Sequence, residues 1–176
     1  MGSPLKRVCV LGCAGAGKTY VARQLAGLAG LPYVDLDRLF WQPGWRVPEE
    51  AAWRAVQRRL VAGSEWVLDG NYASTYDERL PLADTVVVLE TPRWRCLARV
   101  LVRRVRRRGV EVAPGCPDKL DAGFLAYVWR FPRRARPRLD AALAALGPDV
   151  RIVRLRTRRD AAVFLSGLAP AVPESR

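Results

Sequence analysis

Histidine is absent from the 176 residues of the chain. This excludes Ser-His and Cys-His nucleophile pairs, so any proton transfer falls to carboxylates, lysine, tyrosine or water. Cysteine is also sparse, and the four cysteines form no C-x-x-C pair; they are Cys9, Cys13, Cys96 and Cys116. Because they lie far apart or in apolar surroundings, we expect neither a zinc site nor a structural disulfide.

Long apolar runs are missing as well. No stretch reaches the roughly 18 uncharged apolar residues that a membrane-spanning helix needs, and the basic start leads directly into a glycine-rich segment. We therefore expect a soluble, cytoplasmic protein, either a monomer or a homodimer, with no membrane association. Half of the residues are hydrophobic, which favours one well-buried core. We expect one domain over 1–170, followed by a disordered tail at 171–176.

Acidic residues are scarce in the second half of the chain. Residues 1–92 hold ten Lys or Arg and ten Asp or Glu, whereas 93–176 hold twenty basic against seven acidic residues. A compositional bias toward arginine explains part of the total but not this asymmetry. A cationic half suits nucleic acid, a membrane surface or a polyphosphate ligand. One arginine run is expected to be a solvated face, with nucleic-acid contact as the alternative; it comprises Arg104, Arg106, Arg107 and Arg108.

Strand-like and helix-like segments alternate along the sequence. Apolar, β-branched runs predict strands at 8–11, 33–35, 66–69, 85–90 and 150–155. Helical spacing fills the gaps. It predicts one helix that ends at Gly63. It predicts a second helix after Thr91 and Pro92, whose apolar face includes Trp94 and Val105. A third helix, with an N-terminal cap, is predicted to begin at Thr157. This order indicates an α/β fold in which helices cover both faces of a parallel sheet.

Two segments depart from that alternation. Residues 38–64 begin with aromatics around a Pro-Gly pair, and 106–136 hold several glycines and prolines with a short helix that ends near Pro132. Both are expected to lie over the strand ends, the first as an acceptor-binding insertion and the second as a lid.

The strongest motif follows the first strand. The segment from Gly12 to Thr19 matches G-x-x-x-x-G-K-[ST]; its members are Gly12, Cys13, Ala14, Gly15, Ala16, Gly17, Lys18 and Thr19. Small residues let main-chain N–H groups curl around phosphates at the start of a helix. Lys18 is expected to reach the β- and γ-phosphates, and the Thr19 hydroxyl to ligate Mg²⁺. The predicted cofactors are therefore ATP and Mg²⁺.

Carboxylates follow three of the predicted strands. Ligands of open parallel sheets bind beyond the carboxyl ends of strands, where Asp35, Asp37, Asp69 and Glu90 fall. Strand alternation would place Asp35 and Asp37 on one side. Asp37 is the candidate to anchor the acceptor or act as its base, with helix capping as the alternative. Asp69 is the candidate to hold a Mg²⁺-bound water, and Glu90 is the alternative.

With these residues placed, the chain resembles the adenylate-kinase-like branch of P-loop kinases, whose strand-ending L-D-G corresponds to "VLDGN". It is also similar to the small bacterial DNA topology modulation proteins in "LDRLFWQPGW", "WVLDGNY", "ADTVVVLETPRWRC" and "GCPDKLDAGFLAYVWRFPRR". The resemblance implies a three-layer sandwich with a five-stranded parallel sheet, ATP with Mg²⁺, and a mobile arginine-bearing helical lid. It also places Arg99 and Arg103, in R-x-x-x-R spacing, against the phosphates.

The acceptor side departs from adenylate kinases. They continue L-D-G into Phe-Pro-Arg, whereas this chain continues into Asn71-Tyr72-Ala73, which argues against an AMP acceptor. Asp35-x-Asp37 is similar to the D-x-D of shikimate-kinase-like enzymes. Aromatic residues such as Trp45 either form a wall for a ring or pack the loops. The candidate acceptor-binding residues are Asp35, Asp37, Phe40, Trp41, Asp69, Asn71, Tyr72 and Arg133.

Together these features predict an ATP-dependent phosphotransferase with a small-molecule or nucleotide acceptor. Lys18, Asp37, Arg99 and Arg103 are its candidate catalytic residues. The alternative is an ATP-binding regulatory protein that contacts DNA or RNA through its arginine-rich face.

Overall fold

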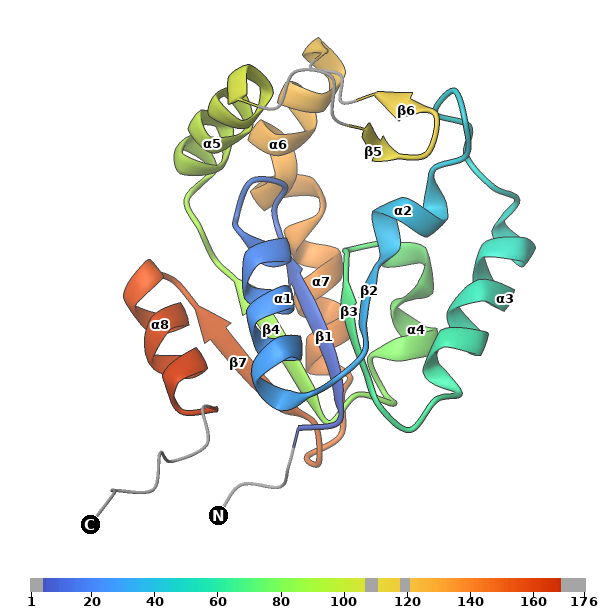
Figure 1. The fold of residues 1–176 in the computed structure, drawn as a ribbon, viewed down its shortest axis with the longest axis vertical. Coiled ribbons are helices and arrows are strands. Elements are labelled where there is room, and N and C mark those ends of the chain that lie inside the picture. Colours follow the sequence, from blue (N-terminus) through green and yellow to red (C-terminus); the bar gives the residue numbers. More distant parts are fainter. Residues whose placement is uncertain (1–4, 107–110, 118–120, 169–176) are drawn as a thin grey trace.

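A five-stranded parallel sheet forms the centre of the chain (Figure 1). The computed structural model describes residues 5–106, 111–117 and 121–168. The strand order is β2-β3-β1-β4-β7. The strands are β1 (Arg7–Gly12), β2 (Tyr33–Asp35), β3 (Trp66–Asp69), β4 (Thr85–Leu89) and β7 (Arg151–Leu155). The prediction of an α/β fold with five parallel strands is confirmed, and each strand lies within a residue or so of its expected place.

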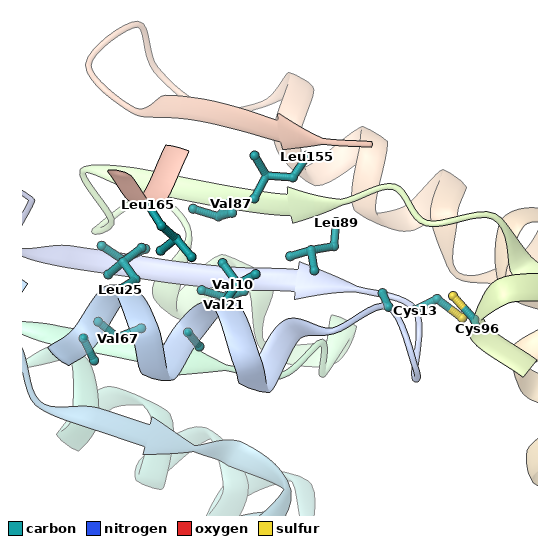
Figure 2. Packing of buried hydrophobic residues seen from close by; sticks show 14 of the residues in the cluster. Val10, Cys13, Val21, Leu25, Val67, Val87, Leu89, Cys96, Leu155 and Leu165 are labelled. Carbon is teal, nitrogen blue, oxygen red and sulfur yellow. The ribbon is translucent and has the colours of Figure 1, made fainter. Parts of the chain in front are cut away.

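Helices pack on both faces of this sheet because its strands are apolar on both sides. Val10 of β1 faces α1 (Lys18–Ala29) and α8 (Arg158–Ser166), in a cluster shown in Figure 2. Leu11, its neighbour, faces the opposite way, into a second cluster with residues from four further helices. These are α2 (Leu36–Phe40), α3 (Glu50–Val61), α4 (Tyr76–Arg79) and α7 (Arg136–Ala144).

The predicted capping of two helices has different outcomes. Thr157 caps α8 in a reciprocal capping box with Asp160, as expected. Gly63 does not close α3, because that helix ends at Val61 and Ala62 is the C-cap in a right-handed conformation. The glycine follows in the bend that leads to β3.

The helix after Thr91 and Pro92 is α5 (Arg93–Arg106), but its predicted buried face is wrong. Trp94 and Val105 are 60% and 69% exposed, whereas Cys96 and Val100 are buried. The reason is that α5 does not lie flat on the sheet. It packs against the loop after β1 and against α6 (Ala122–Arg134), so its contact stripe is narrow.

Helix α6 also extends further than expected, since it continues through Pro132 to Arg134. A proline cannot donate to the carbonyl four residues before it, which here belongs to Val128. The Cys13 thiol lies 3.8 Å from that carbonyl oxygen and supplies a weak donor in place of the missing N–H.

The segments predicted as acceptor insertion and lid contact each other. Residues 38–64 contain the end of α2 (Leu36–Phe40), a turn and α3. Within 106–136, β5 (Glu111–Ala113) and β6 (Cys116–Pro117) form a hairpin, and α6 follows. The Cys116 thiol donates to the Gln42 carbonyl at 3.1 Å, and the Gly44 N–H donates to the Gly115 carbonyl at 3.0 Å. The hairpin therefore rests on the turn after α2 (Figure 1).

Two expectations concern residues beyond those that the structure describes: the tail at 171–176, and Arg107 and Arg108 of the arginine run. Within the described ranges, no helix combines the length and the apolar character required to cross a membrane.

Candidate active site

The loop between β1 and α1 is the segment that the motif predicts to hold phosphates. Gly15 has a φ of +80°, and a Cβ at this position would lie 2.4 Å from the Cys96 carbonyl oxygen. Only glycine combines this conformation with so close an approach. Residues 12–17 thus curl directly against α5, and α1 begins at Lys18 with its N–H groups directed at the loop.

Two cationic side chains border the loop. The Lys18 ammonium donates to the Cys13 carbonyl at 3.2 Å. The Arg99 guanidinium, from α5, donates to the Ala16 carbonyl at 2.8 Å and to the Gly15 carbonyl at 3.4 Å. Arg103 lies one turn further along α5 and is half-buried. Helix α5 therefore presents Arg99 to the same loop that Lys18 contacts.

The structure brings Thr19 and Asp69 together at the foot of the loop. The Thr19 hydroxyl donates to Asp69 Oδ2 at 2.6 Å, and the Tyr33 hydroxyl donates to the same oxygen at 3.2 Å. Asp69 is 3% exposed, and its Oδ1 has no hydrogen-bond partner within the described residues. Burial raises the pKa of this carboxyl. An orphaned carboxylate oxygen beside a threonine hydroxyl fits the oxygen-ligand preference of Mg²⁺.

Glu90, the alternative carboxylate for the metal, forms ion pairs with three arginines. Its carboxylate accepts from Arg136 at 2.6 Å, Arg154 at 2.7 Å and Arg156 at 3.2 Å. Burial alone would raise the pKa of Glu90, but Arg154 and the other two guanidiniums together lower it. Glu90 thus ties α7 to the end of β7, which favours Asp69 for the metal.

The segment after β3 connects the phosphate loop to the acceptor side. Asn71 is paired with Gly12: its Oδ1 accepts from the Gly12 N–H at 3.0 Å, and its Nδ2 donates to the Gly12 carbonyl at 2.8 Å. Tyr72 has a φ of +39° and donates its hydroxyl to Asp37 Oδ1 at 2.6 Å. Asn71, predicted to bind substrate, therefore positions the first glycine of the loop.

Arg79 holds this segment in place, and the sequence reasoning missed it. Its guanidinium is fully buried and donates to the carbonyls of Gly70 and Asn71, to the Thr75 hydroxyl and to the Gln57 amide oxygen. Burial lowers its pKa. No sequence signal separated Arg79 from the other arginines, since its role depends on carbonyls turned inward by the fold.

Asp35 and Asp37 lie close to each other, but not as strand neighbours. Strand β2 ends at Asp35, which caps α2 by accepting from the Asp37 N–H at 3.1 Å. The capping role considered for Asp37 thus belongs to Asp35, while Asp37 is exposed in the first turn of α2. Burial, with the Asp37 and Asp69 charges, raises the pKa of Asp35 to about 6. The expectation from strand alternation is wrong because the strand stops before Asp37.

Aromatic rings surround this pair of carboxylates. Phe40 lies 4.4 Å from Tyr72 and 5.0 Å from both Trp41 and Trp53, measured between ring centroids. Trp53 is almost fully buried, whereas Phe40 and Trp41 are half-buried. Trp53 thus belongs to the core, while the rings of Phe40 and Trp41 keep part of their surface accessible. A wall of aromatic residues for a ring stays a prediction. Arg133 is exposed on α6, and no contact of it with this group is seen.

A pocket of about 500 Å³ lies on the other side of Arg99. Its walls come from the first half of α5 and the start of α8; they are Trp94, Arg95, Ala98, Arg99, Thr157, Arg158 and Arg159. Because Arg99 also touches the phosphate loop, the pocket and the loop are adjacent. Sequence reasoning did not predict this pocket, since its two walls lie far apart in the chain.

Solved structures share the fold of this chain. Shikimate kinase from Acinetobacter baumannii is 17% identical with a TM-score of 0.60, covering 93% of this chain and 90% of its own. A gluconokinase from Sinorhizobium meliloti is 17% identical with a TM-score of 0.55, covering 96% and 95%. Shikimate kinase from Bacteroides thetaiotaomicron is 17% identical with a TM-score of 0.55, covering 93% and 96%. No protein-family model matches the sequence, and no curated protein matches it. The structural likeness shows the fold, which is the P-loop fold of these kinases.

Proposed function

We propose that the protein is an ATP-dependent phosphotransferase that acts on a small hydroxyl-bearing acceptor. One observation carries the proposal: Asn71 pairs with Gly12 of the phosphate loop, and the next residue, Tyr72, donates to Asp37. The loop that would hold a triphosphate and the carboxylate that would meet an acceptor are therefore joined through two adjacent residues. Kinase chemistry requires this proximity, because the two substrates react directly with each other.

The orientation of the nucleotide follows from Arg99. Its guanidinium lies on the phosphate loop and also lines the pocket of about 500 Å³. We place the phosphates in the loop and the nucleoside in the pocket, where the Trp94 ring and the arginines offer stacking surfaces. In this position Lys18, Arg99 and Arg103 supply positive charge around the transferred group, which is the main requirement of phosphoryl transfer.

Mg²⁺ would be held by the Thr19 hydroxyl and, through a water, by Asp69. When bound, it supplies charge neutralisation for the β- and γ-phosphates. Asp69 contributes by staying buried and by orienting Thr19, with which it shares a hydrogen bond of 2.6 Å. Tyr33 fixes the same carboxylate oxygen from β2.

The acceptor is proposed to lie between Asp37 and the half-buried aromatic rings. Its hydroxyl oxygen forms a bond to the γ-phosphorus, the bond from that phosphorus to the ADP oxygen breaks, and Asp37 accepts the hydroxyl proton. The Tyr72 hydroxyl holds Asp37 in place at 2.6 Å. Phe40 and Trp41 suit a ring-bearing acceptor, such as a sugar, a cyclitol or a nucleoside, because stacking on aromatic faces favours flat or apolar ring surfaces.

A screen for acceptor-dependent ADP release tests the proposal. Nucleoside monophosphates, nucleosides, sugars and aminocyclitols are each supplied with MgATP, and at least one class should raise ADP release above the acceptor-free rate. Asp37→Asn should then lower kcat by about 10²-fold or more, the scale of a lost general base, while ATP affinity stays unchanged. Asp149→Asn, an exposed carboxylate before β7, is the matched control and should keep full activity. Equal loss of transfer and of ATP binding in Asp37→Asn would contradict its assigned role.

The arginines of α5 favour a second candidate, an ATP-binding regulatory protein that contacts DNA or RNA. Arg95 and Arg106 are both exposed on this helix. Binding through many phosphates would lose on the order of 10³-fold in affinity between 50 and 200 mM salt. A kinase would show no such loss and would instead turn over ATP faster with its acceptor.

A further inference from the structure

Two of the four cysteines meet at the phosphate loop, although they are far apart in the sequence. Cys13 directly follows Gly12 in the loop, and Cys96 lies in the first half of α5. Figure 2 shows their sulfur atoms side by side, each side chain directed at the other. Both residues are free thiols.

The backbones that carry these thiols are also in direct contact. A Cβ on Gly15 would lie 2.4 Å from the Cys96 carbonyl oxygen, so α5 rests on the loop without an intervening side chain. Cys96 Sγ lies 3.5 Å from the Thr91 carbonyl, which fixes the thiol at the start of α5.

A small cavity borders Cys13 and gives small solutes access to this residue. It has a volume of about 70 Å³ and is lined by residues including Cys13, Phe131, Arg93 and Arg136. One water molecule needs about 10–15 Å³ of such space, so hydrogen peroxide, which is about twice as large, fits. Arg93 and Arg136 add positive charge to this lining, and Glu90, which accepts from Arg136 at 2.6 Å, offsets part of it.

The two thiols also differ in acidity. The neighbouring Cys13 thiol lowers the pKa of Cys96, and the nearby Arg99 and Lys18 charges act in the same direction. The Cys96 thiol, with burial, raises the pKa of Cys13. Cys9 lies on the opposite face of the sheet, and burial raises its pKa to about 11, so it is poorly placed to compete.

We propose that Cys13 and Cys96 are a peroxide-sensitive dithiol whose disulfide joins the phosphate loop to α5 and weakens nucleotide binding. The Cys13 sulfur, which borders the cavity, attacks one peroxide oxygen, the O–O bond breaks, and Cys13 becomes a sulfenic acid with release of water. The Cys96 thiolate then attacks the Cys13 sulfur and displaces a second water. Overall, two thiols lose two electrons and two protons, and one peroxide is reduced to two waters.

The disulfide disturbs the site because a sulfur–sulfur bond is much shorter than the contact between two thiols. Forming it moves Cys13 toward α5. The Cys13 carbonyl accepts from Lys18 at 3.2 Å, and its N–H belongs to the cradle, so both the lysine and the main chain shift. This consequence rests on the proposed nucleotide site, whereas formation of the bond does not.

Peroxide oxidation of the full chain tests the proposal through two separate readouts. After alkylation of the remaining thiols, a tryptic digest places Cys96 in residues 96–99 and both Cys9 and Cys13 in residues 8–18. Fragmentation of the linked peptides should assign the bond to Cys13 and Cys96. In parallel, calorimetry should show ATP affinity at least tenfold weaker after oxidation and restored by dithiothreitol.

Cysteine variants provide the controls. Cys96→Ser should bind ATP like the reduced wild type and lose its response to peroxide, whereas Cys116→Ser, altered in the hairpin, should keep the response. Absence of the Cys13–Cys96 link, or a link that leaves ATP affinity unchanged, would overturn the proposal. If the reduced wild type binds no ATP, the proposed function is contradicted. The presence or absence of the Cys13–Cys96 disulfide in the digest then tests the dithiol by itself.

Discussion

Replacing Arg79 with methionine should destabilise the chain and loosen the segment that joins the two halves of the site. The guanidinium is fully buried and donates to four acceptors: the carbonyls of Gly70 and Asn71, Thr75 Oγ1 and Gln57 Oε1. Methionine fills a similar volume but leaves every acceptor without its donor. An unsatisfied buried acceptor costs about 1–3 kcal/mol, so two carbonyls alone cost roughly 2–6 kcal/mol.

Removing the buried charge recovers part of that cost, because a guanidinium is unfavourable in an apolar setting. We therefore expect a net loss of about 3 kcal/mol in the free energy of unfolding, measured by urea denaturation. Arg59→Met, on the exposed face of α3, is the matched control and should change it by less than about 0.5 kcal/mol. A loss below about 1 kcal/mol for Arg79→Met would refute the reasoning, since the four hydrogen bonds would then contribute little.

Three further substitutions test the packing and electrostatics of the site. Gly15→Ala forces a Cβ to 2.4 Å from the Cys96 carbonyl at a φ of +80° and should lower both the melting temperature and ATP affinity. Gly27→Ala, at an unobstructed position of α1, should instead stabilise by about 0.5–1 kcal/mol; equal effects in thermal melts would contradict the close approach. Asp35→Asn should raise the melting temperature more at pH 8 than at pH 5. Because the pKa rises from 3.8 to about 6 on folding, the cost of ionising this carboxyl grows between these two values and is complete only above the higher one; the opposite order would count against it. Asn71→Leu removes both hydrogen bonds to Gly12 and should weaken ATP binding, which calorimetry measures; unchanged affinity would show that the clamp is dispensable.

The strands could be predicted from the sequence because their signal is local. Val8 to Leu11 and Thr85 to Leu89 are continuous apolar runs, and each forms a strand close to where the pattern places it. The capping box at Thr157 is likewise contained within four residues. The face of α5 could not be predicted in the same way. Its periodicity favours Trp94 and Val105, but the partner that selects the buried stripe is the phosphate loop, which a local pattern does not reveal.

The same distinction between local and long-range signals applies to the candidate active site. Motif spacing predicts the phosphate loop. The rule that the carboxyl ends of parallel strands meet at one edge of the sheet predicts that Thr19 and Asp69 lie close together. The role of Arg79 depends on inward-turned carbonyls, and the contact between Cys13 and Cys96 depends on how closely α5 approaches Gly15. Both are long-range features of packing, for which the sequence holds no spacing signal.

The most direct test of the account is calorimetric titration of ATP with Mg²⁺ into the reduced wild type and into Lys18→Ala. The account predicts saturable uptake of one ATP per chain by the wild type and at least a tenfold weaker affinity in the variant. Lys6→Ala, at an exposed lysine that pairs with Glu65 at 3.9 Å, should bind like the wild type. Absence of uptake by the wild type at millimolar ATP, or equal affinity in Lys18→Ala, would contradict the claim that this loop holds a nucleotide.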